Sequence, residues 1–327
     1  MTQSTKLLSL SLIALCFQSA QAQENGNVAV KLVDTLTELA QGPHKGFRSN
    51  HAKGAIVTGS FTPSAAAKNY STAAHFSQTV PVTVRFSNAT GVPNIPDADP
   101  HARPNGMAIR FTLPDQTSTD IVSISYNGFP VATPEEFLEL LTAIKTNATD
   151  TNKPTKLEQF LQSHPAALTF VQTPKPMPAS FANQSFFGVN SFIFENDKGV
   201  QQHFRYRIVP KAGANFLNDD AAKKMAPDYL MEEIKQRVVK TPVEFSLQAQ
   251  LPNEGDPLLD GSKTWPDDRR LIELGTIKLD ALPADTAAWD KQMFNPLLLP
   301  KGITATADPV LQTRPVAYSV SFGRRLQ

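Results

Sequence analysis

The sequence predicts an α+β fold built around a closed or strongly curved antiparallel sheet. Short runs of alternating apolar and polar residues occur in the first part of the 327-residue chain, and longer runs return after a block of helical patterns. Strands interrupted by a helical insertion are typical of α+β domains, whereas a parallel sheet requires a regular alternation of strands and helices. No internal repeat separates the two sets of strands. We therefore expect them to form one sheet that curls or closes on itself.

The N-terminal part contains one predicted helix followed by four predicted strands. Residues 28–40 place apolar side chains at helical spacing, and Gly42 and Pro43 are expected to end that helix. Four alternating runs follow, each bounded by Gly, Pro, Asn or Asp, which favours antiparallel strands. These runs are residues 55–61, 80–87, 107–113 and 120–126.

The middle of the chain is predicted to be helical, and the second set of strands follows it. Pro134 is expected at the first position of a helix, with Thr133 as its N-cap and Phe137 on its apolar side. Residues 156–162 and 165–172 are two shorter helical patterns. Further strands are expected at 185–194, 201–210, 241–251 and 271–279, with helices within 219–239.

The first 22 residues are predicted to be a cleaved signal peptide. Lys6 gives a positive start, residues 7–16 are apolar and uncharged, and residues 19–22 end in the small-x-small pattern that signal peptidase cuts. The apolar run is shorter than the roughly 20 residues that span a membrane. A lipoprotein site at the only cysteine is the alternative, but Leu15 is too large for the position before it. We expect a periplasmic or secreted protein.

Cleavage would leave a single predicted domain, residues 23–327, with balanced charge and no cysteine. Removing Lys6 leaves 30 basic side chains against 30 acidic ones. This balance gives no reason to expect a nucleic-acid partner or an anionic membrane surface. A chain without cysteine suits an oxidising compartment, and 305 residues are enough for one large core.

Two motifs at opposite ends of the chain carry the candidate chemistry. Arg48-Ser49-Asn50-His51-Ala52-Lys53-Gly54 places a histidine in a short segment bounded by glycine, and Arg314-Pro315-Val316-Ala317-Tyr318 places an arginine four residues before a tyrosine. Taken singly, such a histidine is more often structural, such a tyrosine packs in a core, and the Arg-x-x-x-Tyr spacing is common by chance. The other five histidines show no spacing typical of metal ligands. Acidic residues at Asp97 and Asp99 are expected to lie in a solvated turn rather than in a cation-binding loop.

Together these motifs resemble the haem catalases, and the resemblance runs from about residue 41 to residue 326. Further matching segments occur in the same order as in the family: 84–87, 106–111, 120–122, 265–266, 274–279 and 295–309. The resemblance implies an eight-stranded antiparallel barrel with helices packed outside. It also implies a bound haem, which we expect to be of the b type (heme b).

The resemblance assigns a role to each candidate site residue. His51 would act on the distal face of the haem, where it moves a proton from one peroxide oxygen to the other during O–O cleavage. Tyr318 would bind iron as a phenolate, with Arg314 stabilising the anion. The remaining roles are contacts with the haem: Arg48, Arg85 and Arg325 would pair with the propionates and Phe137 would stack on the ring. Ser87 would hydrogen-bond to the histidine.

The sequence departs from the catalase pattern at positions that matter for mechanism. Ile124 falls where catalases carry a distal asparagine, and Val320, Ser321 and Phe322 replace residues that follow the tyrosine in the family. Ser125 is expected on the opposite strand face, and Asn127 would need a local bulge to reach the haem. The chain ends at Gln327. We therefore expect no flavodoxin-like C-terminal domain.

These departures favour a catalase-related peroxidase that reduces hydrogen peroxide or organic hydroperoxides with a small organic electron donor. Disproportionation of hydrogen peroxide needs a second peroxide held accurately, and the missing amide should weaken that step. A true but weak catalase remains the first alternative. A non-enzymatic haem-binding or hydroperoxide-sensing barrel is the second, although a passive carrier has no need of His51. The sequence names neither the donor nor the oligomeric state.

Overall fold

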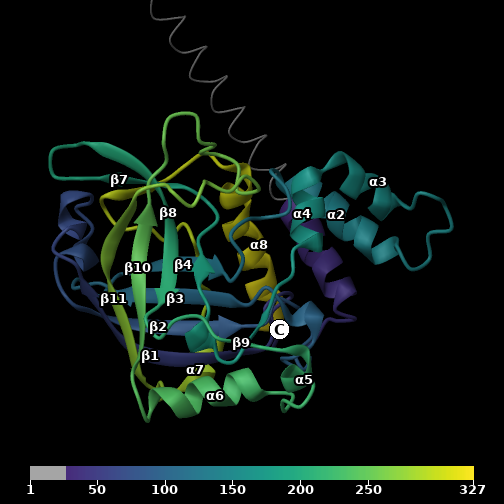
Figure 1. The fold of residues 1–327 in the computed structure, drawn as a ribbon, viewed down its shortest axis with the longest axis horizontal. Coiled ribbons are helices and arrows are strands. Elements are labelled where there is room, and N and C mark those ends of the chain that lie inside the picture. Colours follow the sequence, from purple (N-terminus) through teal and green to yellow (C-terminus); the bar gives the residue numbers. More distant parts are fainter. Residues whose placement is uncertain (1–26) are drawn as a thin grey trace, which may run out of the picture.

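The structure, a computed structural model, describes residues 27–327 and is built around one antiparallel β-barrel with helices outside it (Figure 1). The predicted signal peptide and residues 23–26 lie outside the described residues. No helix among residues 27–327 is long and apolar enough to cross a membrane.

Eight strands close the barrel. Each pairs with its neighbour in antiparallel fashion, and β8 pairs with both β6 and β10, which joins the two ends of the sheet. This closure confirms the predicted closed barrel. In order around the barrel the strands are β10 (Val243–Gln250), β11 (Leu271–Ala281), β1 (Gly54–Pro63), β2 (Val80–Ser87), β3 (Gly106–Thr112), β4 (Ser118–Ile124), β6 (Phe186–Phe187) and β8 (Gln201–Pro210).

Phenylalanine fills much of the main core, where apolar residues of the strands meet those of the outer elements. Phe86 and Phe181 stack with ring centroids 5.0 Å apart, and Phe86 also contacts Phe186 and Phe245. All four rings are fully buried. Stacked and edge-on aromatic pairs add about 0.5–1.5 kcal/mol each beyond the area that they bury. The high phenylalanine content therefore serves packing, as its sequence pattern indicates.

The prediction of one strand over residues 185–194 was wrong. The structure has two short strands, β6 and β7 (Phe192–Glu195), and β7 pairs with β8 and with β12 (Ile303–Ala305). The chain leaves the ladder between them because Gly188 packs closely against Tyr206 and Asn190 turns toward a buried carboxylate. The fourth strand also differs, since it spans Ser118–Ile124 rather than 120–126.

Helices cover the outside of the barrel, and the predicted helical segments are confirmed. Capping boxes begin α2 at Thr133 and α3 at Thr155, where each threonine is paired with a glutamate three residues on. Residues 27–39 are helical. The other helices are α2 (Pro134–Thr146), α3 (Lys156–Ser163), α4 (Pro165–Gln172), α5 (Asp219–Ala222), α6 (Tyr229–Val238), α7 (Thr286–Asp290) and α8 (Pro309–Arg325).

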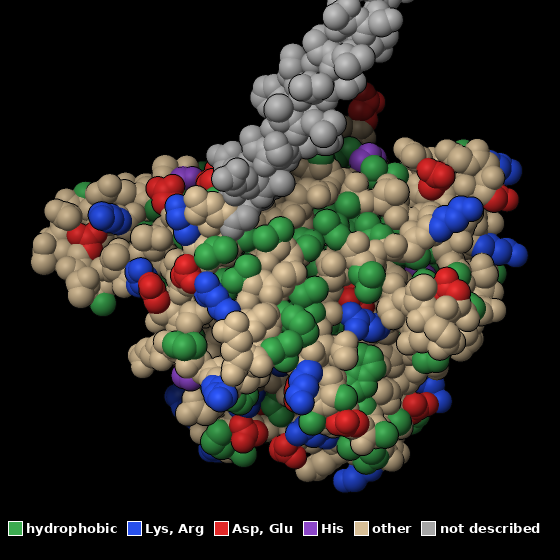
Figure 2. Space-filling model, turned by 180° about the vertical axis from the view of Figure 1, so that it is seen from behind, with side chains coloured by type: hydrophobic (Ala, Val, Ile, Leu, Met, Phe, Trp, Pro, Cys, Tyr) green, Lys and Arg blue, Asp and Glu red, His purple; other side chains and the backbone are tan. Residues whose placement is uncertain are grey.

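Shorter elements complete the described chain. Two small strands, β5 and β9, pair only with each other, and four single-turn 3-10 helices lie in the connections. These elements are β5 (Met177–Pro178), β9 (Phe216–Leu217), η1 (Ala67–Asn69), η2 (Ala74–Phe76), η3 (Pro100–Ala102) and η4 (Phe181–Asn183). On the face seen in Figure 2, basic and acidic side chains are interspersed, in keeping with the balanced charge.

Helix α8 lies between the barrel and the α2–α4 group (Figure 1). Its start is well defined, because Asp308 accepts hydrogen bonds from the backbone N–H groups of Val310 and Leu311 and Pro309 occupies the first helical position. This position brings the C-terminal motif against the barrel wall, about 270 residues after the histidine motif in sequence.

Candidate functional site

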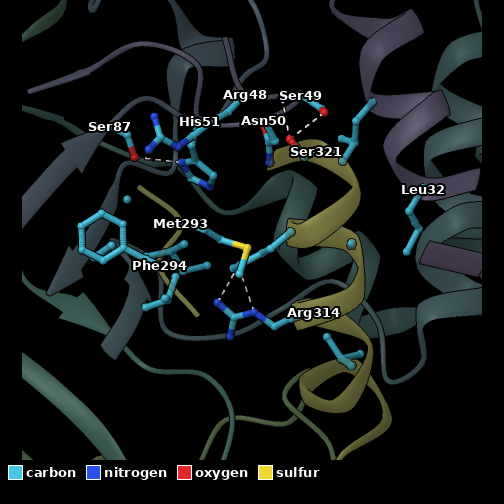
Figure 3. A pocket seen from close by; sticks show the side chains of 18 of the residues that line it. Leu32, Arg48, Ser49, Asn50, His51, Ser87, Met293, Phe294, Arg314 and Ser321 are labelled. Atoms are coloured by element: carbon cyan, nitrogen blue, oxygen red, sulfur yellow. Dashed lines mark hydrogen bonds between the residues drawn. The ribbon is translucent and has the colours of Figure 1, made fainter. Parts of the chain in front are cut away.

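All seven predicted site residues line one cavity of about 270 Å³. Its walls come from helix 27–39, the loop at 48–51, strands β2 to β4, helix α2 and helix α8. Figure 3 shows the histidine loop on one side of the cavity and α8 with Arg314 on the other. The seven residues are Arg48, His51, Arg85, Phe137, Arg314, Tyr318 and Arg325.

His51 is held in a defined orientation on the cavity wall. Its backbone has φ of 56°, a left-handed conformation that is uncommon for residues other than glycine. Its Nδ1 lies 3.0 Å from Ser87 Oγ, and Figure 3 shows the other ring nitrogen turned away from Ser87. Burial, with the positive charges of Arg85 and Arg314, lowers the pKa of His51 to about 4. The imidazole is therefore neutral near pH 7 and able to accept a proton.

Gly106 is required beside this pair. A Cβ on Gly106 would lie 2.6 Å from Ser87 Oγ and 2.9 Å from His51 Nδ1. Any larger residue would push the serine and the imidazole apart, because neither contact leaves room for a methyl group. The glycine of β3 thus permits the hydrogen bond that orients the histidine.

Tyr318 is engaged by a chain of buried polar groups. Arg314 donates to Tyr318 Oη from Nε at 3.1 Å and from Nη2 at 2.9 Å, as expected for positions i and i+4 of one helix. Arg314 also donates from Nη1 to Asn190 Oδ1 at 2.7 Å. Asn190 in turn donates to the Asp308 carboxylate at 2.7 Å. The guanidinium is thus fixed against the phenol oxygen.

Asn190 and Asp308 are functional candidates that the sequence did not reveal. Asn190 lies in the segment that was expected to be a continuous strand, so its side chain was not singled out. The Asp-Pro pair at 308–309 carries the signal of a helix start, and that signal placed the helix but not its buried contacts. Burial raises the pKa of the Asp308 carboxyl, partly offset by the hydrogen bond from Asn190.

Three arginines converge at one end of the cavity. Arg85 and Arg325 are buried, and the Nε atom of each has no hydrogen-bond partner among the described residues. Burial together with the charges of Arg85 and Arg325 lowers the pKa of Arg48 to about 8, and burial lowers that of Arg85 to about 10. Asp290, 4.0 Å from Arg48, is the acidic group whose charge acts on all three. Clustered buried cations with unmatched donors are suited to binding carboxylates.

Residues 290–294 close this end of the cavity and were not singled out by the sequence. The Gln292 carbonyl accepts from Arg48 at 3.0 Å and from Arg325 at 2.6 Å. Met293 and Phe294 line the cavity itself. Buried Asp120 secures this segment, because its carboxylate accepts from Asn295 N at 2.8 Å and pairs with Arg110 at 2.7 Å.

The barrel wall near His51 carries an apolar residue and no primary amide. Ile124 lines the cavity, together with Val122 and Ser123. Ser125 does not line it, because its Oγ accepts from the backbone of Asn105 at 2.9 Å. Asn127 does not line it either. The expectation that neither residue substitutes for the missing distal asparagine agrees with this arrangement.

The lining as a whole fits a flat, largely apolar group that carries carboxylates at one edge. Phe137 packs against Phe129 with ring centroids 4.9 Å apart, and both rings line the cavity. Most of the remaining wall is aliphatic, while the unmatched arginine donors lie together at one end. Haem has this distribution of polarity, and Tyr318 would be its iron ligand. The cavity therefore fits the cofactor that the sequence predicts.

The acidic loop at 97–99 is not a metal site. Asp97 is fully buried rather than solvated, and it pairs with Lys53 at 2.8 Å and accepts from Asn88 at 2.8 Å. Asp99 caps the turn at His101. Within residues 27–327, no group of three or more His, Cys, Asp and Glu side chains is placed to hold a metal ion. The prediction of a solvated turn was wrong for Asp97, since three separate segments surround its carboxylate.

Comparison with known proteins agrees with this arrangement. The catalase family profile matches residues 16–326. A catalase-related peroxidase of Synechococcus elongatus is 34% identical over 291 residues, which cover 87% of this chain and 85% of that protein. A catalase-related peroxidase of Mycolicibacterium paratuberculosis is 33% identical and covers 87% of this chain and 90% of that protein. A catalase of Neisseria gonorrhoeae is 30% identical, with 85% of this chain covering 58% of that longer protein.

Solved structures share the fold at lower identity. A fungal catalase matches with a TM-score of 0.75 at 22% identity, covering 90% of this chain and 62% of that one. Catalase A from Saccharomyces cerevisiae matches with a TM-score of 0.76, also at 22% identity, and covers 90% and 64% of the two chains. The chain thus spans somewhat less than two thirds of these larger proteins. Profile, relatives and fold agree, and the chain belongs to the catalase family.

Proposed function

We propose that the protein is a haem-dependent peroxidase that reduces hydrogen peroxide or organic hydroperoxides with an organic electron donor. The observation that carries the proposal is the single cavity in which a neutral, oriented His51 and the Arg314–Tyr318 pair both take part. Bound haem would supply the redox-active iron at which the peroxide is reduced. The printed names of the two relatives with the widest coverage support peroxidase activity.

His51 moves the proton. With Nδ1 engaged by Ser87, the second ring nitrogen accepts a proton from the incoming peroxide oxygen and returns it to the leaving oxygen as water or alcohol. The depressed pKa of His51 keeps the ring ready to accept that proton at neutral pH. General acid–base catalysis of this kind contributes about 10²–10⁴-fold to a rate.

Arg314 and the arginine cluster hold negative charge. Two guanidinium N–H groups directed at Tyr318 Oη stabilise a phenolate, which is the form that binds ferric iron. Arg48, Arg85 and Arg325 would receive the two cofactor carboxylates, which offset the mutual repulsion of the three cations. The apolar walls exclude water and strengthen these charged contacts.

Ile124 favours the peroxidase over the catalase alternative. Its side chain offers no hydrogen bond to a second hydrogen peroxide, so the two-electron oxidation of that molecule lacks a positioning group. The apolar wall also suits larger hydroperoxides. A passive haem carrier is disfavoured, because it gains nothing from a histidine oriented by Ser87 and Gly106.

We expect Ile124→Asn to raise oxygen release relative to donor oxidation by about tenfold, because a correctly placed hydrogen bond to charged or polarised oxygen contributes about 1.4 kcal/mol. An oxygen electrode and a phenolic dye, read on the same haem-loaded preparation, give the ratio. Ile124→Leu, which keeps the site apolar, is the matched control and should leave the ratio unchanged. A parent protein that already releases oxygen faster than it oxidises any donor would replace this proposal by the catalase alternative.

We also propose that the protein is exported to the periplasm or secreted after removal of residues 1–22. The charged start, the short apolar run and the small-x-small site support this. The expected result is that N-terminal sequencing of the protein from a periplasmic or culture-fluid fraction begins at Gln23. Full-length protein retained in the cytoplasm would contradict it.

A further inference from the structure

A second cavity, of about 500 Å³, adjoins the first at the end where the arginines lie. It lies between helix 27–39, the loop that follows it and the C-terminal end of α8. Four residues line both cavities: Arg48, Ser49, Ser321 and Arg325. Nothing derived above for peroxide cleavage uses the second cavity.

The partition between the two cavities is thin. Ser49 Oγ and Ser321 Oγ are 2.9 Å apart, and the backbone N–H of Ser49 also donates to Ser321 at 3.1 Å. Figure 3 shows this pair close to His51 and Asn50. A molecule in the second cavity would therefore be separated from the edge of the first by one layer of side chains.

The charge in the second cavity is basic once existing ion pairs are taken into account. Asp34 pairs with Arg324 at 2.7 Å, and Glu38 pairs with Lys145 at 2.7 Å. Exposed Lys45 has no acidic partner within 4.0 Å among residues 27–327. Arg48 and Arg325 add two more positive charges from the shared wall.

An aromatic surface lies at the rim of this basic hollow. Phe47 lines the second cavity with 46% of its surface exposed, next to Lys45 in the same loop. The buried Nε of Arg325 has no hydrogen-bond partner among the described residues. An exposed ring beside unmatched cationic donors is suited to an aromatic molecule that carries an anionic group.

We propose that the second cavity binds the electron donor, and that the donor is a phenolic compound carrying a carboxylate. This inference rests on the peroxidase function proposed above. Each turnover converts one hydroperoxide and two phenols into one alcohol or water, one further water and two phenoxyl radicals, so each phenol loses one electron and one proton. An electron needs only proximity to the cofactor edge, and the donor has no need to reach His51.

The test uses three donors that share a phenol ring and differ in charge. They are 4-hydroxyphenylacetate (anion), 4-ethylphenol (neutral) and tyramine (cation). For the haem-loaded parent, both the dissociation constant, from NMR line broadening of the phenol protons without peroxide, and the donor KM should be lowest for 4-hydroxyphenylacetate. Lys45→Glu should raise both values for this anion by about 3- to 10-fold, change those for 4-ethylphenol little and lower those for tyramine. The KM for peroxide should stay unchanged.

Lys240→Glu is the matched control, because it makes the same change in net charge at an exposed residue outside both cavities. Equal effects of the two variants, or an equal effect of Lys45→Glu on all three phenols, would overturn the donor site. A parent that oxidises the three phenols with the same KM would also overturn it while leaving the peroxidase proposal standing. A parent that binds 4-hydroxyphenylacetate but oxidises none of the phenols would instead remove the peroxidase proposal.

Discussion

Tyr318→Phe should abolish stable haem binding, or leave a haem whose spectrum lacks phenolate charge transfer. The phenol oxygen is the atom at which Arg314 directs two N–H groups, and phenylalanine removes that oxygen while keeping the ring. The Arg314 guanidinium, which keeps its bond to Asn190, would then have no anion to stabilise. Haem content per chain and the absorption spectrum of the purified protein provide the measurement.

Tyr126→Phe is the matched control for this variant. Tyr126 lies outside the cavity, where its hydroxyl meets Thr173 at 3.4 Å. It should bind haem as the parent does, with an unchanged spectrum. If Tyr318→Phe also retains full haem occupancy and the parent spectrum, another group binds the iron and the assignment of Tyr318 is wrong.

His51→Ala should slow peroxide cleavage by at least about 10²-fold while haem is retained. The imidazole is the group placed to move the proton, and its loss removes acid–base catalysis without removing the arginine cluster or Tyr318. Stopped-flow mixing of the haem-loaded variant with peroxide gives the rate of the first spectral change. His101→Ala, at an exposed site on a turn, is the control and should react at the parent rate.

The same residue sets the expected pH dependence of the parent. Because burial and neighbouring arginines lower the pKa of His51 to about 4, the ring stays neutral from pH 7 down to that value. Peroxide cleavage should therefore persist below the ordinary histidine range and fall as pH drops through about 4, where protonation removes the base. The His51→Ala variant should lack this acidic limb. Equal rates for parent and variant throughout the range would show that His51 does not move the proton.

Much of the site was predictable because short motifs identify residue types locally. The pattern of alternating residues located the barrel strands to within two or three residues for β1, β2, β3 and β8. The i and i+4 spacing of Arg314 and Tyr318 already implied their contact, provided that the segment was helical. The structure adds that helix 27–39 and residues 290–294 complete the cavity, which no local pattern indicates.

The elements that were missed depend on contacts between distant segments. Residues 185–194 read as one strand because phenylalanine and isoleucine favour strands, but Gly188 and Asn190 leave the ladder to meet Tyr206 and Asp308. Short α7 and β12 carry too few residues for a periodic signal. In each case the free energy of burying a group against a remote partner outweighs the local preference.

By itself, the sequence determined the antiparallel strands, the capped helices and the identities of His51 and Tyr318, because these depend on side-chain order over a few residues. Only the tertiary structure decided that β8 closes the barrel onto β10 and that Arg314 is held by Asn190 and Asp308. It also decided that the Ser49–Ser321 pair separates two adjoining cavities. The physical reason is that a buried polar group must find a partner wherever the fold places one, and that partner can lie more than a hundred residues away in the chain.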